Sequence, residues 1–350
     1  MGVIPAGRQD AVARVGLVLG AGGIVGQAYQ AGVLAALESE LGWDPRTADV
    51  IVGSSAGSLT GAALRLGVPT RDLEASVLGK AVSPEGAILE TIASEGTVIP
   101  PFDPRHALRG WRLPSPSLIA RTARRPWAFR PTSAAATLLP AGFVDIVLPA
   151  DVLAPLLGGP WPEGLWICAA RRDDGARTVF GRPGSPAAPL GRAVAASCAI
   201  PGYFAPVEIG GIEYFDGGVH SPTNADVLRN EGLDLVVVIS SMSAAHGRAA
   251  VPGGGIRWAA HRRLEGEVRR LRSAGTEVVR IEPNGETVAV MGANAMAPHR
   301  SAPVARAART DAATYLATSR VAAKLEALSA KPAKPGRSTE QAPAGRAPVA

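Results

Sequence analysis

The sequence predicts an α/β fold with a mostly parallel central sheet that is covered by helices on both faces. Short apolar strands alternate with helical segments along most of the 350 residues. Strands joined in this way pair in parallel through right-handed crossovers, and strands that are apolar along their whole length are typical of a sheet buried on both faces. A content of 47% apolar and 19% charged residues is typical of a globular protein.

The first part of the chain gives the order of strand and loop on which the rest of the prediction depends. Val15–Leu19 is expected to be a short buried strand, and the glycine loop Gly20–Gly26 follows it at once. Apolar residues then recur at helical spacing from Val25 to Leu37. Asp49–Val52 predicts a second strand, which runs directly into a turn of small residues and a further helix.

The later elements are predicted from the same patterns, and the sequence contains no internal repeat. Further strands are expected at Leu165–Ala170, Thr178–Phe180, Glu213–Phe215, Leu235–Ile239 and Glu277–Ile281. Helices are expected at Arg192–Cys198, Asn224–Glu231, Ile256–Leu271 and Pro303–Leu328.

Composition divides the chain into one large domain and two flanking segments. Residues 1–14 show no period and carry proline and glycine, so we expect an N-terminal extension there. Residues 15–330 hold all the predicted elements. Residues 331–350 are rich in proline, alanine and basic side chains and are expected to form a disordered basic tail.

The segment from Pro100 to Pro140 differs from the rest of the domain and is expected to be an inserted cap. Prolines interrupt it, arginines are frequent, and Asp103 is its one acidic residue. Trp111, Trp127 and Phe129 are interleaved with the arginines. This combination suits a membrane interface, where rings sit at headgroup level and guanidinium groups meet phosphate. A solvated cap whose tryptophans face the core explains the same composition.

Charge and cysteine content bear on partners and compartment. The net charge of +6 favours an anionic partner, although a need for solubility explains the same charge. We expect peripheral association with anionic membrane, and no nucleic acid. Cys168 and Cys198 cannot form a disulfide framework and are expected to be buried thiols in a reducing cytoplasm. No run of about 18 apolar residues and no signal-peptide pattern occurs, which also favours a cytoplasmic protein.

The strongest candidate nucleophile is a serine between small residues. Gly53-Ser54-Ser55-Ala56-Gly57 fits the G-x-S-x-G pattern and lies where a strand would turn into a helix. A serine at such a turn has a strained backbone, so the residues two positions away, Gly53 and Gly57, must lack bulk. A short pattern of this kind also arises by chance, in which case Ser55 is only a helix cap.

A second candidate is the glycine loop, Gly20-Ala21-Gly22-Gly23-Ile24-Val25-Gly26, between the first strand and the first helix. Its free amides could bind the pyrophosphate of a dinucleotide or the oxyanion of a tetrahedral intermediate. A dinucleotide site requires an acidic residue at the far end of the second strand. That end holds Ser54 and Ser55, whereas Asp49 lies at the opposite end. An oxyanion hole beside a serine turn therefore explains both loops.

The third candidate is Asp216-Gly217-Gly218, which follows an expected strand. A lone Asp-Gly-Gly is usually only a turn. The segment Ala196–Pro206, a helix end of small residues followed by a proline-glycine bend, leads toward the same region. This context adds weight to a functional role for Asp216.

The three motifs, taken in this order, resemble those of the patatin-like phospholipase family. The likeness extends over about Val15 to Leu328 and includes Ala196–Pro206 and the late segment Met291–Asn294, which is similar to that of bacterial members. It implies a three-layer α/β/α domain and a lipid-ester substrate. The glycine loop departs from the family pattern, with Ala21 at the usual first glycine and Val25 where arginine is common.

The resemblance also implies a role for each motif. Ser55 would attack the ester carbonyl while Asp216 accepts its proton, giving an acyl-enzyme that water hydrolyses. The oxyanion would be stabilised by backbone amides, those of Gly22, Gly23, Ile24 and Ala56. The motif glycines that would shape the loops are Gly26, Gly53, Gly57, Gly217 and Gly218. No cofactor is expected, and no metal, because no His, Cys or Asp cluster has ligand spacing.

Three alternatives stay open at the level of sequence. An α/β-hydrolase would use a Ser-His-Asp triad, with His220, His246, His261 and His299 as candidates, although that fold places several strands before its serine turn. A lipid-binding protein could keep the fold without turnover. Acyl transfer to an acceptor other than water would use the same acyl-enzyme, and the sequence does not name the lipid.

Overall fold

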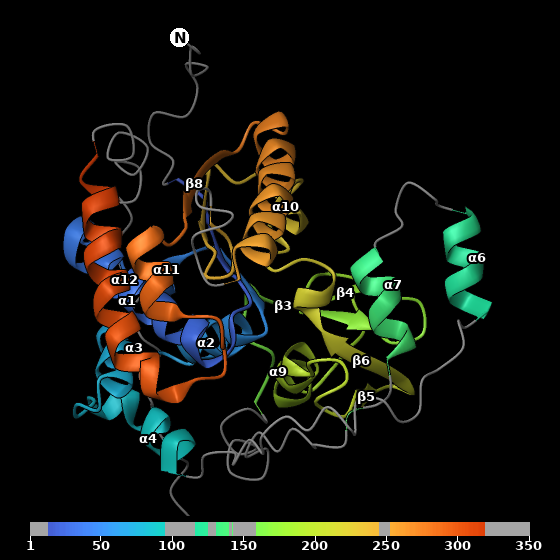
Figure 1. Cartoon of the computed structure of the whole chain (residues 1–350), viewed down its shortest axis with the longest axis horizontal. Helices are drawn as coiled ribbons and strands as arrows, with labels where there is room; N and C mark the ends of the chain where they lie inside the picture. Colours follow the sequence, from blue (N-terminus) through green and yellow to red (C-terminus); the bar gives the residue numbers. More distant parts are fainter. Residues whose placement is uncertain are drawn as a thin grey trace, which may run out of the picture.

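An eight-stranded mixed sheet forms the centre of the molecule (Figure 1). The computed structural model describes residues 13–94, 116–124, 131–139, 142, 159–244 and 253–318. The strand order is β5-β6-β3-β2-β1-β7-β8, with β4 paired to β3. The predicted fold class is confirmed, because the sheet is mostly parallel and helices cover both of its faces.

Five neighbouring strands run parallel and three shorter ones add antiparallel pairs. The parallel strands are β3 (Leu165–Arg171), β2 (Val50–Ser54), β1 (Val15–Leu19), β7 (Leu235–Ile239) and β8 (Glu277–Ile281). The antiparallel ones are β4 (Arg177–Phe180), β5 (Val207–Ile209) and β6 (Ile212–Asp216). Every strand expected from the sequence is present, and among the described residues only the three-residue β5 was missed.

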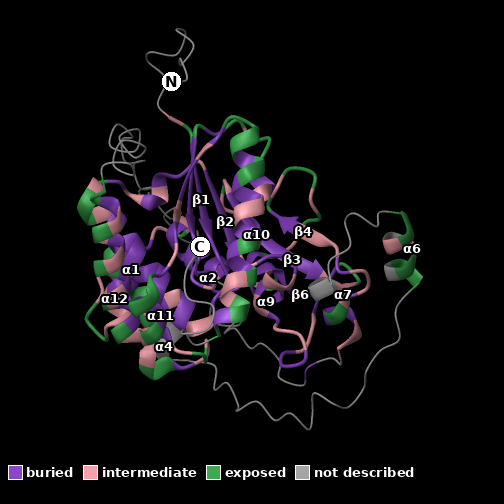
Figure 2. Ribbon diagram, turned by 45° about the horizontal axis from the view of Figure 1, so that its top comes forward, coloured by how far each residue is buried: buried purple, intermediate pink, exposed green. Residues whose placement is uncertain are grey.

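The sheet is buried on both faces, which explains the continuous apolar sequence of its parallel strands. In β1, Leu17 and Leu19 pack into one core and Val18 into the other. The first core contains α1 (Gly23–Leu41), α2 (Ala56–Arg65), α9 (Leu190–Cys198) and α12 (Ser301–Leu316), and the second contains α10 (Gly254–Ser273). Figure 1 shows α1 and α12 side by side, away from α10, and Figure 2 shows the buried strands between these layers.

Two predicted helices need correction. Asn224–Glu231 is not an α-helix: Asn224 is left-handed, with φ 52°, and only a 3-10 turn follows at Ala225–Leu228. The helix predicted to reach Leu328 ends at Leu316, where both the N–H and the hydroxyl of Thr318 donate to the Tyr315 carbonyl, and residues 319–328 lie outside the described residues. The helices that were not predicted are α3 (Thr70–Val77), α4 (Ala87–Ser94), α6 (Pro116–Arg124), α7 (Pro131–Leu138) and α11 (Gly285–Met291).

The predicted cap, residues 100–140, is described only at α6 and α7. Ala136 and Thr137 of α7 are buried, and α7 lies against the turn that follows Asp216. Asp103, Trp111, Trp127 and Phe129 lie outside the described residues, as do 1–12 and 319–350. The division into extension, domain, cap and tail therefore stays a prediction. Within the described ranges, no helix has both the length and the apolarity needed to cross a membrane.

Candidate active site

Two strands lie end to end along one edge of β3. β2 pairs with residues 165–168 of β3 and β6 pairs with residues 169–171, whereas β4 pairs with residues 167–170. A strand has two edges, so partners whose pairing overlaps must lie on opposite ones. β2 and β6 therefore share the edge that β4 does not occupy.

The registers bring the ends of β2 and β6 to neighbouring positions. Ser54 pairs with Cys168, and Asp216 pairs with the next residue, Ala169. Both strands end there, β2 at the serine turn that leads into α2 and β6 at the aspartate turn. Residues about 160 positions apart in the sequence thus meet because one strand, β3, holds both of their strands.

Ser55 occupies a strained turn between β2 and α2, as the motif predicts. Its backbone angles are φ 52° and ψ −122°, a combination that a residue with a side chain adopts only when its surroundings hold it there. Gly57 permits the turn, because a Cβ atom there would overlap the carbonyl oxygen of Leu19. Gly53 is equally enclosed, by the backbone of the first turn of α2. Ala56 is the first residue of α2, and its N–H has no acceptor among the described residues.

The serine turn is also held from α9. The Ser55 N–H donates to Ser197 Oγ over 2.9 Å, and the Ser197 hydroxyl donates to the Cys168 carbonyl over 2.7 Å. Ser197 is fully buried, so one hydroxyl ties the serine turn to β3. The sequence analysis singled out Ala196–Pro206 but missed Ser197, because one serine among small helical residues has no pattern of its own.

The Asp216 side chain faces the Ser55 hydroxyl. Burial raises the pKa of Asp216 to about 6, and hydrogen bonds from the Ser55 side chain and from the Gly218 N–H act in the opposite direction. The Gly218 N–H lies 2.7 Å from Asp216 Oδ1. Gly217, between them, packs against the Cys168 carbonyl with no space for a side chain. At neutral pH the carboxyl group is therefore ionised and hydrogen-bonded to the serine.

The glycine loop reaches the same place from the end of β1. The Ala21 N–H donates to the Pro222 carbonyl over 2.7 Å, and the Ala21 carbonyl accepts from the Ser241 hydroxyl over 2.8 Å. A Cβ atom at Gly26 would lie 2.7 Å from that hydroxyl, and one at Gly218 would lie 3.1 Å from the Ala21 side chain. The loop is thus fixed between the aspartate turn and the end of β7. Ser241 was not expected from the sequence.

Three backbone amides of the glycine loop have no hydrogen-bond acceptor among the described residues. α1 begins at Gly23, and the first N–H groups of a helix have no intrahelical acceptor. In the part of the chain that the structure describes, no group accepts a hydrogen bond from the N–H of Gly22, Gly23 or Ile24. The Val25 N–H, by contrast, donates to the Ala295 carbonyl over 3.0 Å. The helix dipole adds positive potential at these amides.

A sequence profile of the patatin-like phospholipases matches residues 17–229, more than half of the chain. This range contains the glycine loop, and it contains the serine turn and the aspartate turn, whose strands meet at one edge of β3. The chain belongs to the patatin-like phospholipase family. Membership identifies it as a hydrolase acting on ester bonds, of the lipid-ester kind in general.

Solved structures with a similar fold are at most 19% identical to this chain. VipD from Legionella pneumophila is 13% identical with a TM-score of 0.43, and the match covers 87% of this chain and 67% of VipD. ExoU in its heterodimeric complex with SpcU, from the type III secretion system of Pseudomonas aeruginosa, is 19% identical with a TM-score of 0.34 and the match covers 87% of this chain. A second ExoU structure is 18% identical with a TM-score of 0.37. The chain spans about half the length of the ExoU chains, 51% and 53%. No curated protein matches the sequence.

Both cysteines are free thiols close to the site, and Cys168 is buried as predicted, whereas Cys198 is only half-buried. Cys198 Sγ lies 3.8 Å from Ser58 Oγ, and it is also hydrogen-bonded to the Ser55 side chain. Burial raises the pKa of Cys168 and of Cys198 to about 12. Both thiols are therefore neutral at physiological pH, and neither is a thiolate nucleophile.

The four histidines that a triad could use lie in different parts of the chain. His261 Nδ1 lies 2.9 Å from Glu282, next to the end of β8, and His299 lies in a 3-10 turn before α12. His220 ends the aspartate turn, and its carbonyl accepts from Arg263 Nη2 over 3.1 Å. His246 lies outside the described residues. Within those residues, no group of three His, Cys, Asp or Glu side chains could hold a metal ion.

Proposed function

We propose that this protein hydrolyses fatty-acyl ester bonds of lipids, phospholipids among them, through a Ser55–Asp216 dyad and an acyl-enzyme intermediate. The observation that supports the proposal most is the strained serine turn, whose hydroxyl is hydrogen-bonded to a buried carboxylate. The three glycine-loop amides without a described acceptor support the oxyanion part of the proposal. Membership of a phospholipase family supports a lipid ester as substrate.

The proposed reaction has two halves with one base. Ser55 Oγ attacks the ester carbonyl carbon while Asp216 accepts the hydroxyl proton, and the oxyanion is stabilised by the amides of Gly22, Gly23, Ile24 and Ala56. The intermediate collapses with loss of the alcohol, which takes the proton back from Asp216. Water then attacks the acyl-enzyme, Asp216 accepts a proton from it, and the fatty acid leaves as Ser55 regains its proton.

The raised pKa of Asp216 fits the role of base. A base works best when its pKa lies near the operating pH, because it must be deprotonated and yet hold a proton well. A carboxylate with a pKa of about 6 meets both needs better than one at the ordinary value of 3.8. The pKa also lies far below that of a serine hydroxyl, so we expect modest turnover.

The proposed role of Asp216 predicts an acidic limb in the pH profile. Because the deprotonated form is the active base, kcat should be constant above pH 7 and fall about tenfold per pH unit well below a midpoint near 6. The measurement is kcat for a soluble ester between pH 4.5 and 8.5. A midpoint near 4 would mean that Asp216 is not the base or is not buried during turnover.

The lipid substrate is tested with vesicles of defined composition. We expect fatty acid to be released from vesicles that contain phospholipid, and faster release when anionic lipid is included, since the segment from Pro100 to Pro140 is rich in arginine. Released fatty acids are measured by mass spectrometry, together with flotation of the protein on the same vesicles. Hydrolysis of short soluble esters without any release from vesicles would contradict the lipid part of the proposal, and flotation that is independent of anionic lipid would contradict the membrane part.

A further inference from the structure

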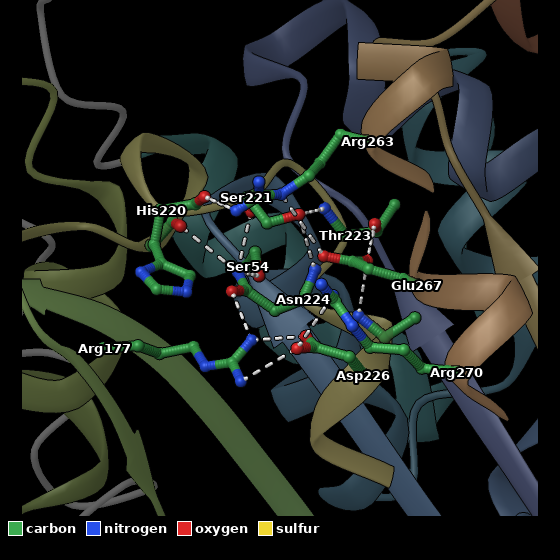
Figure 3. Close-up of polar contacts among 12 residues, drawn as sticks. Ser54, Arg177, His220, Ser221, Thr223, Asn224, Asp226, Arg263, Glu267 and Arg270 are labelled. Carbon is green, nitrogen blue, oxygen red and sulfur yellow. Dashed lines mark hydrogen bonds and ion pairs between the residues drawn. The ribbon is translucent and has the colours of Figure 1, made fainter. Parts of the chain in front are cut away.

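We propose that Asn224 is a positioning residue that locks the serine turn to the aspartate turn, so that Ser55 and Asp216 keep their hydrogen-bonded geometry. This inference rests on the proposed dyad and adds a residue to it. Asn224 comes from neither strand that carries the dyad and lies in the loop between the aspartate turn and a 3-10 helix. Figure 3 shows its side chain between Ser54, Arg177 and Asp226.

The Asn224 carboxamide contacts the chain on both sides of the site. Its Nδ2 lies 2.9 Å from Ser54 Oγ, 3.1 Å from the Gly217 carbonyl and 2.7 Å from the Ser221 carbonyl. Ser54 immediately precedes the proposed nucleophile, and Gly217 immediately follows the proposed base. Asn224 is fully buried, so no water replaces these contacts when they are lost.

An ion pair fixes which way the carboxamide points. Arg177 Nη1 donates to Asn224 Oδ1 over 3.1 Å and to Asp226 Oδ1 over 2.6 Å. Because a guanidinium group only donates, the atom facing Arg177 must be the oxygen, and the donor nitrogen must face Ser54. The ion pair is itself mostly buried, with side chains 18% and 13% exposed. The orientation of the Asn224 carboxamide is therefore fixed by Arg177.

Glu267 of α10 holds the same loop from the far side. Its Oε2 accepts from the Thr223 hydroxyl over 2.6 Å and from the Ala225 N–H over 2.9 Å, one residue on either side of Asn224. Figure 3 shows these bonds from α10 beside those to Asn224. Glu267 thus holds the loop on both sides of Asn224, and the Asn224 carboxamide connects this fixed loop to Ser54 at the end of β2.

The backbone of Asn224 indicates a functional constraint. Among the described residues, Ser55 and Asn224 are the two non-glycine residues with positive φ, both at 52°. Residues held in such conformations cluster at functional sites, because the surrounding structure must hold them against the strain. Ser54 links the two strained residues: it precedes Ser55 in the chain, and its hydroxyl accepts a hydrogen bond from the Asn224 side chain.

The test is the replacement Asn224→Gly. Glycine adopts the same left-handed backbone without strain, so this variant removes the carboxamide alone. We expect kcat to fall about 100-fold with little change in KM, since a displacement of about 1 Å between reacting groups is enough for that loss. The rate of Ser55 labelling by a fluorophosphonate probe should fall with it. The acidic limb should move to higher pH, because loss of the Ser55 hydrogen bond raises the pKa of Asp216.

A matched control separates positioning from stability. Thr287→Val removes a buried hydrogen bond to Asp311, 3.0 Å long, on the remote helix α11. This variant should lower the melting temperature and leave kcat and the acidic limb unchanged. If Asn224→Gly also leaves both unchanged, or loses activity only in proportion to its unfolded fraction, the proposal is overturned.

A double-mutant cycle tests the link from the other end. Ser54→Ala removes the acceptor next to the serine turn, and it applies even where Asn224→Gly fails to fold. We expect Ser54→Ala to lower kcat about tenfold on its own and not at all in the Asn224→Gly background, where the contact between Ser54 and Asn224 is already lost. Additive losses would overturn the role of Asn224 and leave the dyad untouched, whereas a fully active Ser55→Ala variant would overturn the dyad itself.

Discussion

Replacing Ser55 by alanine is expected to abolish ester hydrolysis, with kcat lower by about 10⁵-fold. The proposed reaction needs the Ser55 hydroxyl, which lies on the strained turn and is hydrogen-bonded to the Asp216 carboxylate. Alanine meets the same backbone requirement as serine, so the fold should persist with a melting temperature close to that of the unmodified protein. The measurement is fatty-acid release from phospholipid vesicles under saturating conditions.

The control for this prediction is a buried hydroxyl in α2, the helix that begins directly after Ser55. Thr60 lies one turn beyond the site, and its hydroxyl donates to the Ala56 carbonyl over 3.2 Å. Thr60→Ala should retain activity within about threefold, as is usual for a change that touches no reacting group. A Ser55→Ala variant that keeps one tenth or more of the original kcat would contradict the assignment of the nucleophile.

Replacing Asp216 by asparagine is expected to inactivate the enzyme and to stabilise its fold. Without a base, kcat should fall about 10⁴-fold. Asparagine can still accept from the Gly218 N–H, so the aspartate turn should be kept. The free energy of unfolding should rise by up to about 3 kcal/mol at pH 7, because the pKa rises from 3.8 to about 6 and each tenfold change in an equilibrium is about 1.4 kcal/mol.

The sign of this stability change follows from linkage. The folded state binds the Asp216 proton more tightly than the unfolded state does, so stability falls as the pH rises from 3.8 to about 6 and is then constant. Above pH 6 the ionised carboxylate is a buried charge that the fold tolerates, and asparagine removes it. Asp216→Asn should therefore gain most at neutral pH and little below pH 4. Thermal unfolding at both pH values measures the difference.

Asp226 provides a control of opposite sign for stability. Burial alone would raise its pKa, but the hydrogen bond and the charge of Arg177 hold that pKa below its ordinary value. Its carboxylate therefore contributes stability above the unfolded pKa, and this contribution is lost as the pH falls. Asp226→Asn should destabilise the protein by about 3 kcal/mol at pH 7, since it leaves Arg177 without its charged partner. A stabilising Asp226→Asn would contradict this reading of both carboxylates.

His220 distinguishes the dyad from the triad that the sequence left open. Under the dyad, His220→Ala should retain ester hydrolysis, whereas a Ser-His-Asp triad would lose it as completely as the Asp216→Asn variant does. Equal inactivation of the two variants would show that the proposed base is wrong. The comparison should be made at pH 8, above the acidic limb.

The parts of the fold that depend on local pattern were predictable. β1, β7 and β8 have the predicted bounds because each is a short apolar run next to a clear break. The strand β5 was missed because three residues are too few to show a period. The pattern of Asn224–Glu231 predicts a helix, because periodicity does not reveal that Asn224 is left-handed and hydrogen-bonded to Ser54 and Gly217.

The motifs of the site were predictable, but the contacts that assemble it were not. The serine turn and the aspartate turn were recognised from small residues around one reactive side chain, and from a resemblance to a family. Their meeting along one edge of β3 depends on registers between distant strands, which no local pattern encodes. Ser197, Ser241 and Asn224 are single polar residues without a motif, so only their buried hydrogen bonds reveal them.

Location of a covalent adduct tests the central claim most directly. The protein is treated with a fluorophosphonate ester, which reacts with activated serines, and the modified peptide is sequenced by mass spectrometry. One adduct on Ser55, formed with a pH midpoint near 6 and absent from the Asp216→Asn variant, is the result we predict. An adduct on another residue, or labelling of Ser55 at an unchanged rate without Asp216, would contradict the account.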